Sequence, residues 1–310
     1  MKILNLLMFS LVLCCSTFAT NIDTSIFVKS ELKMQDLIDD ILKSRELKER
    51  QEASLELERL MEETLKNNGS NDYSFGNLVG VSLQEPTDNT FRIFTWQLYI
   101  DKNHYLYKGF IQTKDGKVFR LEDKSPDMQT VQFSILKPEN WYGALYYNIL
   151  DFKYEGEQFY LLFGYDAIDF YNKRKLLEVL YFDKTGKPKF GKSVIEMQDS
   201  YARKLMVKRF LLEYSSSVNV TLNYDKDLDM IIYDHLIYGT PFKDSGPSNL
   251  PDGSYCGLKL SKEGIWKYID KVHKDDPSKI LVDATSYETI IGKSKGLSKK
   301  NQKDIFGRSK

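Results

Sequence analysis

The amino-acid sequence predicts a mainly β protein, an antiparallel meander preceded by an N-terminal helical segment. After Gly69, apolar and polar side chains alternate in several short runs, as they do in half-buried strands. Short polar turns such as Asp115-Gly116 join these runs, and no helical windows of about 10 to 15 residues separate them. A propeller-like arrangement, a barrel and a sandwich all satisfy this pattern, because no fixed repeat period distinguishes them.

The first segment, residues 1–19, has the features of a cleavable signal peptide. Lys2 precedes an apolar run that ends near Cys15, and the run is too short to span the ~30 Å core of a bilayer. Thr17 and Ala19 are suitably small residues for cleavage before Thr20. We therefore expect an exported protein, periplasmic or secreted.

A lipid anchor is the alternative to plain cleavage. Acylation would require a small residue directly before the modified cysteine, but Leu13 precedes Cys14 and Cys14 precedes Cys15. This arrangement favours plain cleavage over a lipoprotein.

Residues 20–69 form the charged helical segment. The stretch 30–67 contains no Gly or Pro and is rich in good helix formers. Its apolar residues form two stripes, Met34, Leu37, Ile38, Ile41 and Leu42, then Leu57, Leu60, Met61 and Leu65. Residues 44–54 between the stripes are almost wholly polar, so either two helices turn there or one long helix bridges solvent.

Residues 70–276 are predicted to form the antiparallel β-rich domain. The clearest strand is 218–224, in which Val218, Val220, Leu222 and Tyr224 alternate with polar residues. Further strand-like runs are 91–100, 105–112, 141–150, 158–164, 176–182, 210–214, 228–236, 255–260 and 265–272, all rich in aromatic and β-branched residues.

Residues 277–310 are predicted to be a basic, flexible tail. From Lys293 to Lys310 the chain carries seven basic residues and one acid, Asp304. The tail is either simply solvated or makes an electrostatic contact with an anionic surface polymer or lipid headgroups. The tail and a lipid anchor are the only features that suggest contact with a membrane.

The overall charge and the cysteine content narrow the range of possible partners and of stabilising bonds. Forty-four basic residues balance 44 acidic ones, so no global charge favours nucleic acid as a partner. Cys256 is the only cysteine beyond the signal, which excludes an intramolecular disulfide in the mature chain. Cys256 shares a strand face with Leu258 and Leu260, which predicts a buried thiol.

Few motifs suggest metal, cofactor or phosphate chemistry. His104, His235 and His273 are far apart in the sequence, and no phosphate-binding glycine loop occurs, so we expect no metal site and no cofactor. The acidic stretch Asp225 to Asp229 resembles the start of a calcium loop, but it lacks the expected Gly and Glu and fits a hairpin turn better.

One long connection contains the residues closest to a catalytic set. Residues 238–254 hold three prolines and three glycines, together with Asp244 and Ser245 in an Asp-Ser-Gly sequence found around serine protease nucleophiles. Asp234 and His235 precede it directly and could form an acid–base pair, although neighbours on a strand point to opposite faces. We expect this loop to border the principal pocket.

Clustered aromatic residues suggest binding. Trp96 belongs to one such cluster, and Trp141, Tyr142 and Tyr146 to another. If exposed, these rings could stack on sugars or anchor a protein interface; alternatively they are core residues of an aromatic-rich sheet.

Four segments resemble those of an uncharacterised family of exported proteins from Bacteroidota. They are Phe91-Arg92-Ile93-Phe94-Thr95-Trp96, Asn140-Trp141-Tyr142-Gly143-Ala144-Leu145-Tyr146-Tyr147, Phe163-Gly164-Tyr165-Asp166 and Pro251-Asp252-Gly253-Ser254-Tyr255. The resemblance spans roughly residues 75–272 and implies a cell-envelope or secreted location. It implies no activity and no catalytic residues.

These observations favour a non-catalytic envelope protein that binds a glycan, peptide or protein partner. The alternative is a secreted hydrolase whose site assembles from distant Asp, His and Ser residues. The two hypotheses differ in what they require, because binding needs exposed aromatic rings and hydrolysis needs a cleft that joins His to carboxylates.

The processing site is directly testable. We expect the intact mass of the exported protein to correspond to a chain that begins at Thr20. A mature N-terminus carrying lipid on Cys14 or Cys15 would contradict this prediction.

Overall fold

The computed structural model describes residues 24–128, 130–198, 203–241 and 246–272. Two helices come first, α1 (Ser25–Lys43) and α2 (Leu47–Leu65). The first sheet has the order β1 (Ser82–Gln84), β2 (Phe91–Asp101), β3 (His104–Thr113) and β4 (Val118–Glu122). The central sheet has the order β11 (Arg209–Ser215), β7 (Asn172–Phe182), β6 (Glu157–Asp166) and β5 (Leu145–Tyr154), with β8 (Pro188–Phe190) also pairing with β7. The third sheet has the order β10 (Lys204–Val207), β9 (Ile195–Gln198), β15 (Trp266–Ile269), β14 (Ser248–Leu260), β13 (Met230–Gly239) and β12 (Leu222–Asp225).

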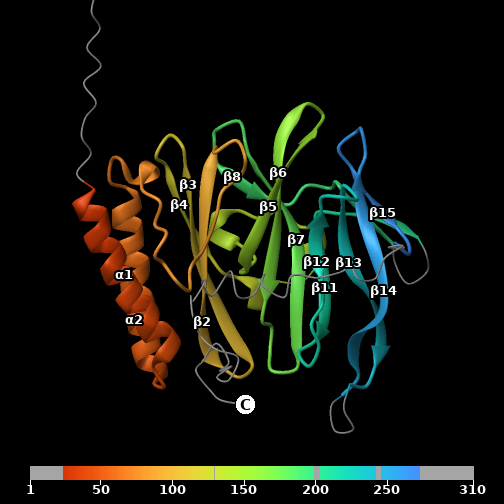
Figure 1. Cartoon of the computed structure of the whole chain (residues 1–310), viewed down its shortest axis with the longest axis horizontal. Helices are drawn as coiled ribbons and strands as arrows, with labels where there is room; N and C mark the ends of the chain where they lie inside the picture. The colour runs from red at the N-terminus through yellow and green to blue at the C-terminus, as the bar shows by residue number, and fades with distance from the viewer. Residues whose placement is uncertain (1–23, 129, 199–202, 242–245, 273–310) are drawn as a thin grey trace, which may run out of the picture.

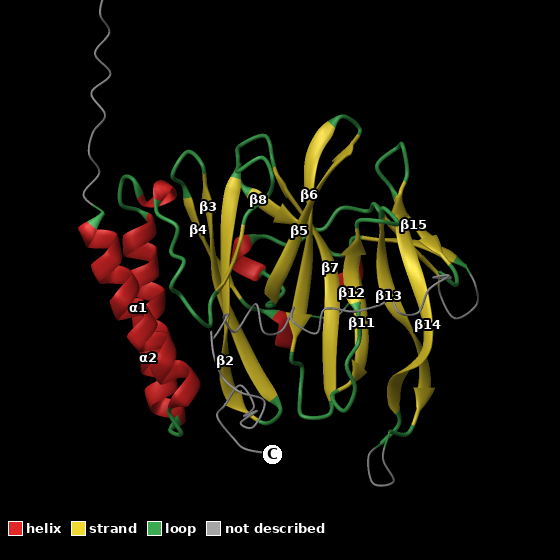
Figure 2. Cartoon of the chain, viewed as in Figure 1, coloured by secondary structure: helices red, strands yellow, loops and turns green. Residues whose placement is uncertain are grey.

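The helices and the three sheets lie side by side as successive layers (Figures 1 and 2). Each interface between layers contains its own hydrophobic cluster. The sheets are antiparallel except for one parallel contact between β15 and β9. The predicted mainly β, antiparallel fold with an N-terminal helical segment is confirmed. Of the three architectures left open, the described residues form sandwich-like sheets and do not close into a barrel.

The helical segment forms two helices, not one. The first helix begins at Ser25, earlier than the apolar stripes suggest, and ends at Lys43. Ser44 adopts an extended conformation, so the chain turns before α2 begins at Leu47. Arg50 stabilises this turn, because its guanidinium donates to the carbonyls of Ser44 and Arg45 and reaches Tyr99 at the end of β2.

The two predicted apolar stripes pack against the first sheet. Met34 and Ile38 of α1 and Leu57 and Met61 of α2 are buried in one cluster with Trp96 and other residues of β2 and β3. Burying a side chain of this size stabilises the fold by roughly 1.5 to 3 kcal/mol. The helical segment and the strand-rich region therefore share a core.

The central sheet is buried on both faces. Along β6, Leu162 faces the first sheet while Leu161 and Phe163 face the third sheet. Leu176 and Leu177 of β7 divide between the two faces in the same way. Antiparallel sheets commonly leave one face in water, but here neither face is polar enough to do so. The central sheet must therefore lie between two other layers.

The third sheet covers the second face of the central sheet. Cys256 of β14 is buried in this interface beside Leu258, which confirms the predicted buried thiol. The sulfur lies 3.5 Å from the hydroxyl of Tyr268 on β15.

Most predicted strands are present, and one predicted loop is wrong. The runs in β2, β3, β6, β7, β11, β13 and β14 lie at their expected places, whereas Trp141 precedes β5 and 218–221 precedes β12. Residues 238–254 do not form a long loop, because the chain re-enters the sheet at Ser248. Pro251 is accommodated opposite Leu236, directly after a bulge within β13.

The interface between the first and central sheets contains a buried ion pair. The guanidinium of Arg209 on β11 donates to the carboxylate of Glu178 on β7, and both side chains are fully buried. Arg209 also donates to the Val131 carbonyl at 2.6 Å, and Tyr146 donates to Glu178. Because every charge has partners, the desolvation cost of the pair is largely offset.

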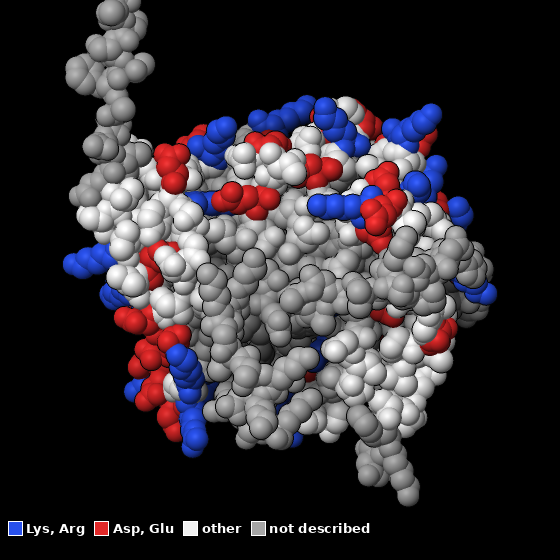
Figure 3. Space-filling model, viewed as in Figure 1, with Lys and Arg blue, Asp and Glu red and all other residues white. Residues whose placement is uncertain are grey.

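Charged side chains of both signs are interspersed over the helices and the upper loops (Figure 3). Along α2, Arg59 pairs with Glu56 and Glu63, and Lys66 pairs with Glu62. Exposed pairs at this spacing add little to the stability of a helix, because water and salt screen them.

The buried ion pair should be sensitive to the loss of one partner. Arg209→Met leaves the Glu178 carboxylate buried without its cation, so we expect the free energy of unfolding to fall by about 3 to 5 kcal/mol in urea denaturation. Arg209→Met/Glu178→Leu should be less destabilised than the single variant. The exposed control Lys66→Met should change stability by about 0.5 kcal/mol or less. A loss at Arg209→Met no larger than that of the control would contradict the assignment.

Candidate functional site

Two adjacent aromatic rings project from the connection between β6 and β7. Phe170 and Tyr171 are each 59% exposed, and their rings pack edge to face with centroids 5.1 Å apart. We call residues 167–171 the aromatic loop. Large rings normally contribute to the core, so an exposed pair of this kind is unusual among the described residues.

Hydrogen bonds fix the backbone of the aromatic loop. The carboxylate of Asp169 accepts from the backbone N–H groups of Tyr171 and Asn172, each at 2.7 Å. Ser216 donates through its hydroxyl to the Phe170 carbonyl and through its N–H to the Tyr171 carbonyl, each at 2.7 Å. The two rings are therefore held on a rigid backbone although they face solvent.

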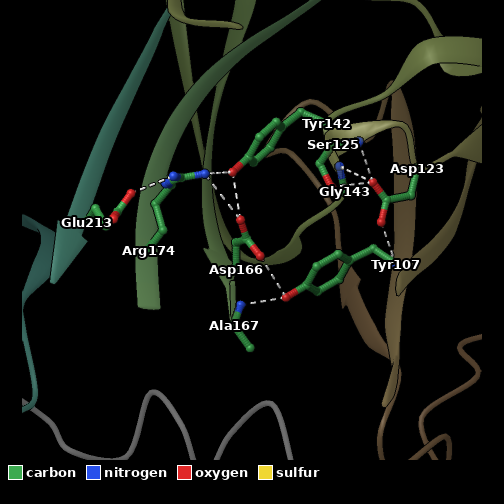
Figure 4. Close-up of polar contacts among 9 residues, drawn as sticks. All are labelled: Tyr107, Asp123, Ser125, Tyr142, Gly143, Asp166, Ala167, Arg174 and Glu213. Atoms are coloured by element: carbon green, nitrogen blue, oxygen red, sulfur yellow. Dashed lines mark hydrogen bonds and ion pairs between the residues drawn. The ribbon is translucent and has the colours of Figure 1, made fainter. Parts of the chain in front are cut away.

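A buried polar network supports the aromatic loop at the end of β6 (Figure 4). The carboxylate of Asp166 accepts hydrogen bonds from Tyr142 at 2.6 Å and from Tyr107 at 3.2 Å. The Tyr107 hydroxyl in turn accepts from the N–H of Ala167, the first residue of the loop, at 2.6 Å. Because Tyr107 belongs to β3 and Asp166 to β6, the network joins two sheets beneath the loop.

Arg174 of β7 connects this network to solvent. Its guanidinium donates to the Tyr142 hydroxyl, lies 3.5 Å from Asp166 and forms a 2.6 Å ion pair with the partly exposed Glu213. Cross-strand register places Arg174 opposite Asp166 on one side and Glu213 on the other. The arrangement is therefore fixed by the sheet and not by side-chain flexibility.

Asp123 fixes the backbone of Tyr107, whereas Asp166 and Ala167 contact its hydroxyl. Its carboxylate accepts from the N–H of Tyr107 at 2.9 Å and from the hydroxyl of Ser125 at 2.6 Å. It also accepts from the N–H of Gly143, where a Cβ atom would lie 2.3 Å from the Asp123 carboxyl carbon. A side chain at position 143 would therefore displace Asp123.

Burial dominates the electrostatics of the network. It raises the pKa of Asp166 to about 6, against the opposing effects of the Tyr142 hydrogen bond, the Arg174 charge and the Tyr107 hydrogen bond. Burial also raises the pKa values of Tyr107 and Tyr142 well above their usual range. Of Asp166, Tyr107 and Tyr142, Asp166 is therefore the group whose charge changes nearest to neutral pH.

The end of the third sheet lies beside the aromatic loop. Ser248 donates to the side-chain oxygen of Asn172 at 3.0 Å, and Asn249 donates to the Glu213 carbonyl at 2.9 Å. On the paired strand β13, Ile237 and Tyr238 are exposed, Tyr238 to 75%. Exposed apolar side chains therefore gather at this end of the molecule.

The four aromatic residues predicted to bind are buried, which corrects the expectation of exposed rings. Trp96, Trp141, Tyr142 and Tyr146 are at most 2% exposed. Trp96 lies in the core between the helices and the first sheet, and the other three lie between the first and central sheets. Trp141 and Tyr146 are hydrogen-bonded to each other and so complete the surroundings of Glu178. Tyr142 belongs to the network beneath the aromatic loop.

Asp234 and His235 lie on opposite faces, as their adjacent positions on a strand require. Asp234 is buried, and its carboxylate accepts from the N–H of Thr221. His235 is partly exposed and lies 2.8 Å from the carboxylate of Asp252. The Ser254 hydroxyl donates to Asp252 and not to His235, so this group lacks the order of a Ser-His-Asp triad. Asp244 and Ser245 lie outside the described residues.

Sequence reasoning missed two features of this region. Lys175 is buried beside the ring of Tyr147, and burial lowers its pKa to about 8 despite the nearby Asp234 carboxylate. The aromatic loop was not predicted either. The sequence indicates this loop only by an aromatic pair that lies between two turn-forming residues, Asp169 and Asn172. Turn-forming residues on both sides place the two rings outside regular strands.

No family model, curated protein or solved structure matches the chain. Among the described residues, no group of His, Cys, Asp and Glu side chains is arranged to hold a metal ion. None of the described helices is long and apolar enough to cross a membrane. The signal segment and the basic tail lie outside the described residues.

The raised pKa of Asp166 predicts a pH-dependent stability. Between about pH 4 and pH 6 the unfolded chain has lost this proton while the folded protein retains it. The free energy of unfolding should therefore fall as pH rises, by about 3 kcal/mol for a shift from 3.8 to about 6. Urea denaturation of the wild type and Asp166→Asn across this range isolates the effect. Parallel stability curves for the two proteins would exclude it.

Proposed function

We propose that the protein is a non-catalytic binding protein of the cell envelope that holds a peptide segment of a partner protein at the aromatic loop. The observation that carries this proposal is the pair of exposed rings, Phe170 and Tyr171, on a backbone fixed by hydrogen bonds. Aromatic side chains anchor many interfaces because they bury large areas with few rotatable bonds.

Rigidity of the loop favours binding over a purely structural role. A flexible loop would lose backbone conformational freedom when a partner bound, at about 1 to 2 kcal/mol for each residue fixed. Here Tyr107 and Ser216 already restrain the backbone of the loop. Less conformational entropy therefore remains to be lost on binding.

The neighbouring groups indicate a peptide-like partner. Tyr238 of β13 is a further exposed ring at the same end of the sheets, and the partly exposed Glu213 with its partner Arg174 supplies charge there. An apolar centre with a charged border matches a segment that has both apolar and polar side chains. A glycan, which we also expected as a partner, offers less apolar surface than a peptide for the exposed rings of Phe170 and Tyr171.

The hydrolase alternative has weaker support. The partly exposed His235 pairs with Asp252, but the hydroxyl of Ser254 lies on the carboxylate and not on the imidazole. Nucleophilic catalysis by serine needs the imidazole to accept the hydroxyl proton. The proposed envelope location rests on the predicted signal of residues 1–19 and on the resemblance to exported proteins.

Site-specific photo-crosslinking tests the proposal in cells. A photoreactive residue at position 171 should capture a partner protein, and the same residue at the exposed position Phe133 should not. With the purified partner, Phe170→Ala/Tyr171→Ala should weaken binding at least about tenfold, the effect of losing one interface anchor. Phe133→Ala is the matched control and should bind normally.

The same variants separate binding from folding. Because both rings are largely exposed, the double variant should retain its free energy of unfolding within about 0.5 kcal/mol. Equal crosslinking at positions 171 and 133, or an unchanged affinity of the folded double variant, would overturn the proposal.

A further inference from the structure

A polar hollow of about 450 Å³ lies at the opposite end of the sheets from the aromatic loop. Three segments line it: residues 68–72 after α2, residues 85–92 from the end of β1 to the start of β2, and residues 112–114 at the end of β3. Asp88, in the second segment, accepts a hydrogen bond from Tyr160 near the start of β6, whereas the aromatic loop follows the end of β6. Figure 1 shows the two regions on opposite sides.

One of the residues that line the hollow is a buried cation. Arg92 is only 4% exposed, and its guanidinium donates to the carbonyls of Ser70 and Tyr73 and to the side-chain oxygen of Gln112. Its plane also lies over the rings of Phe75 and Phe94. These three bonds use three of the five N–H hydrogens and involve no carboxylate. Two N–H groups therefore remain for a further acceptor.

Hydrogen bonds hold the walls of the hollow together. Asn71 donates to the Lys114 carbonyl at 3.2 Å, and the N–H of Lys114 donates to the Thr90 carbonyl at 2.9 Å. Asp88 accepts from the N–H of Thr90 and from Tyr160, which fixes the β1–β2 connection beside Asn89. The hollow is therefore largely formed before any ligand arrives.

The lining charges are balanced and interleaved with amides. The lining contains two cations, Arg92 and Lys114, and two carboxylates, Asp72 and Glu85. Three asparagines, Asn68, Asn71 and Asn89, add groups that both donate and accept hydrogen bonds.

The balance of charges in the hollow limits the kind of ligand that it can bind. A simple anion would meet the two carboxylates, and a simple cation would meet Arg92 and Lys114. An uncharged ligand with many hydroxyl groups can donate to the carboxylates and accept from the cations at once.

We infer that this hollow binds a neutral saccharide of about one or two sugar rings. The site is independent of the proposed peptide site, because it uses different residues at the other end of the fold. Asp72 and Glu85 accept hydrogen bonds from the sugar hydroxyls, and Arg92 and Lys114 donate to the sugar oxygens.

Nuclear magnetic resonance with defined sugars tests this inference on the full chain. The probes are the neutral disaccharides maltose, cellobiose, lactose and N,N′-diacetylchitobiose, with glucuronate and glucosamine as charged comparisons. At concentrations on the order of 10 mM, at least one neutral disaccharide should shift the amide signals of Asn68, Asn89 and Lys114. The amide signals of Phe170 and Tyr171 should not move.

Variants at exposed positions confirm where the sugar binds without disturbing the core. Asp72→Ala/Glu85→Ala should weaken the binding of that disaccharide about tenfold, the loss expected when charged hydrogen-bond partners are removed. The matched control Glu157→Ala removes an exposed carboxylate outside the hollow and should bind normally.

Three outcomes would overturn the inference. They are no shift with any neutral disaccharide, stronger binding of glucuronate or glucosamine than of the neutral sugars, and unchanged affinity in the folded double variant. None of these outcomes bears on the peptide site, which crosslinking at position 171 tests separately.

Discussion

The need to cover the central sheet on both faces governs the arrangement of the whole molecule. Leu161 and Leu162, adjacent on β6, are both fully buried on opposite faces of the sheet. An antiparallel sheet of this composition cannot leave a face in water without exposing several large apolar side chains. The first sheet covers one face and the third sheet covers the other, and the helices then cover the outer face of the first sheet.

The polar groups inside this stack are placed by the same constraint. Glu178 and Arg209 occupy paired positions on β7 and β11, so the register that buries the apolar residues also brings these charges together. Four residues away along β7, Arg174 lies opposite Glu213, and the register with β6 places it opposite Asp166. Both groups of charges lie on the same face of the central sheet, and the guanidiniums of Arg174 and Arg209 both contact the ring of Tyr142. The group at the end of β6 supports the aromatic loop.

Packing of the faces leaves the ends of the sheets for binding. At one end the chain exposes Phe170 and Tyr171 on a fixed loop, and at the other end Arg92 lines a polar hollow. Connections at strand ends carry binding residues in many proteins, because their side chains are not needed to fill the core. The two ends differ in chemistry, one apolar and aromatic and the other polar with balanced charge. This difference is the physical reason for assigning a peptide to one and a saccharide to the other.

The sequence alone determined the mainly β class, the helical segment, most of the longer strands and the opposite orientations of Asp234 and His235. It did so because periods of two and of 3.6 residues are local properties of the chain. The short strands β1, β4, β8, β9 and β10 escaped prediction because three to five residues hold too little periodicity. The burial of Trp96 and Trp141 was decided only by tertiary structure. Alternation shows which side chains share a face, but whether that face meets water depends on which distant layer covers it.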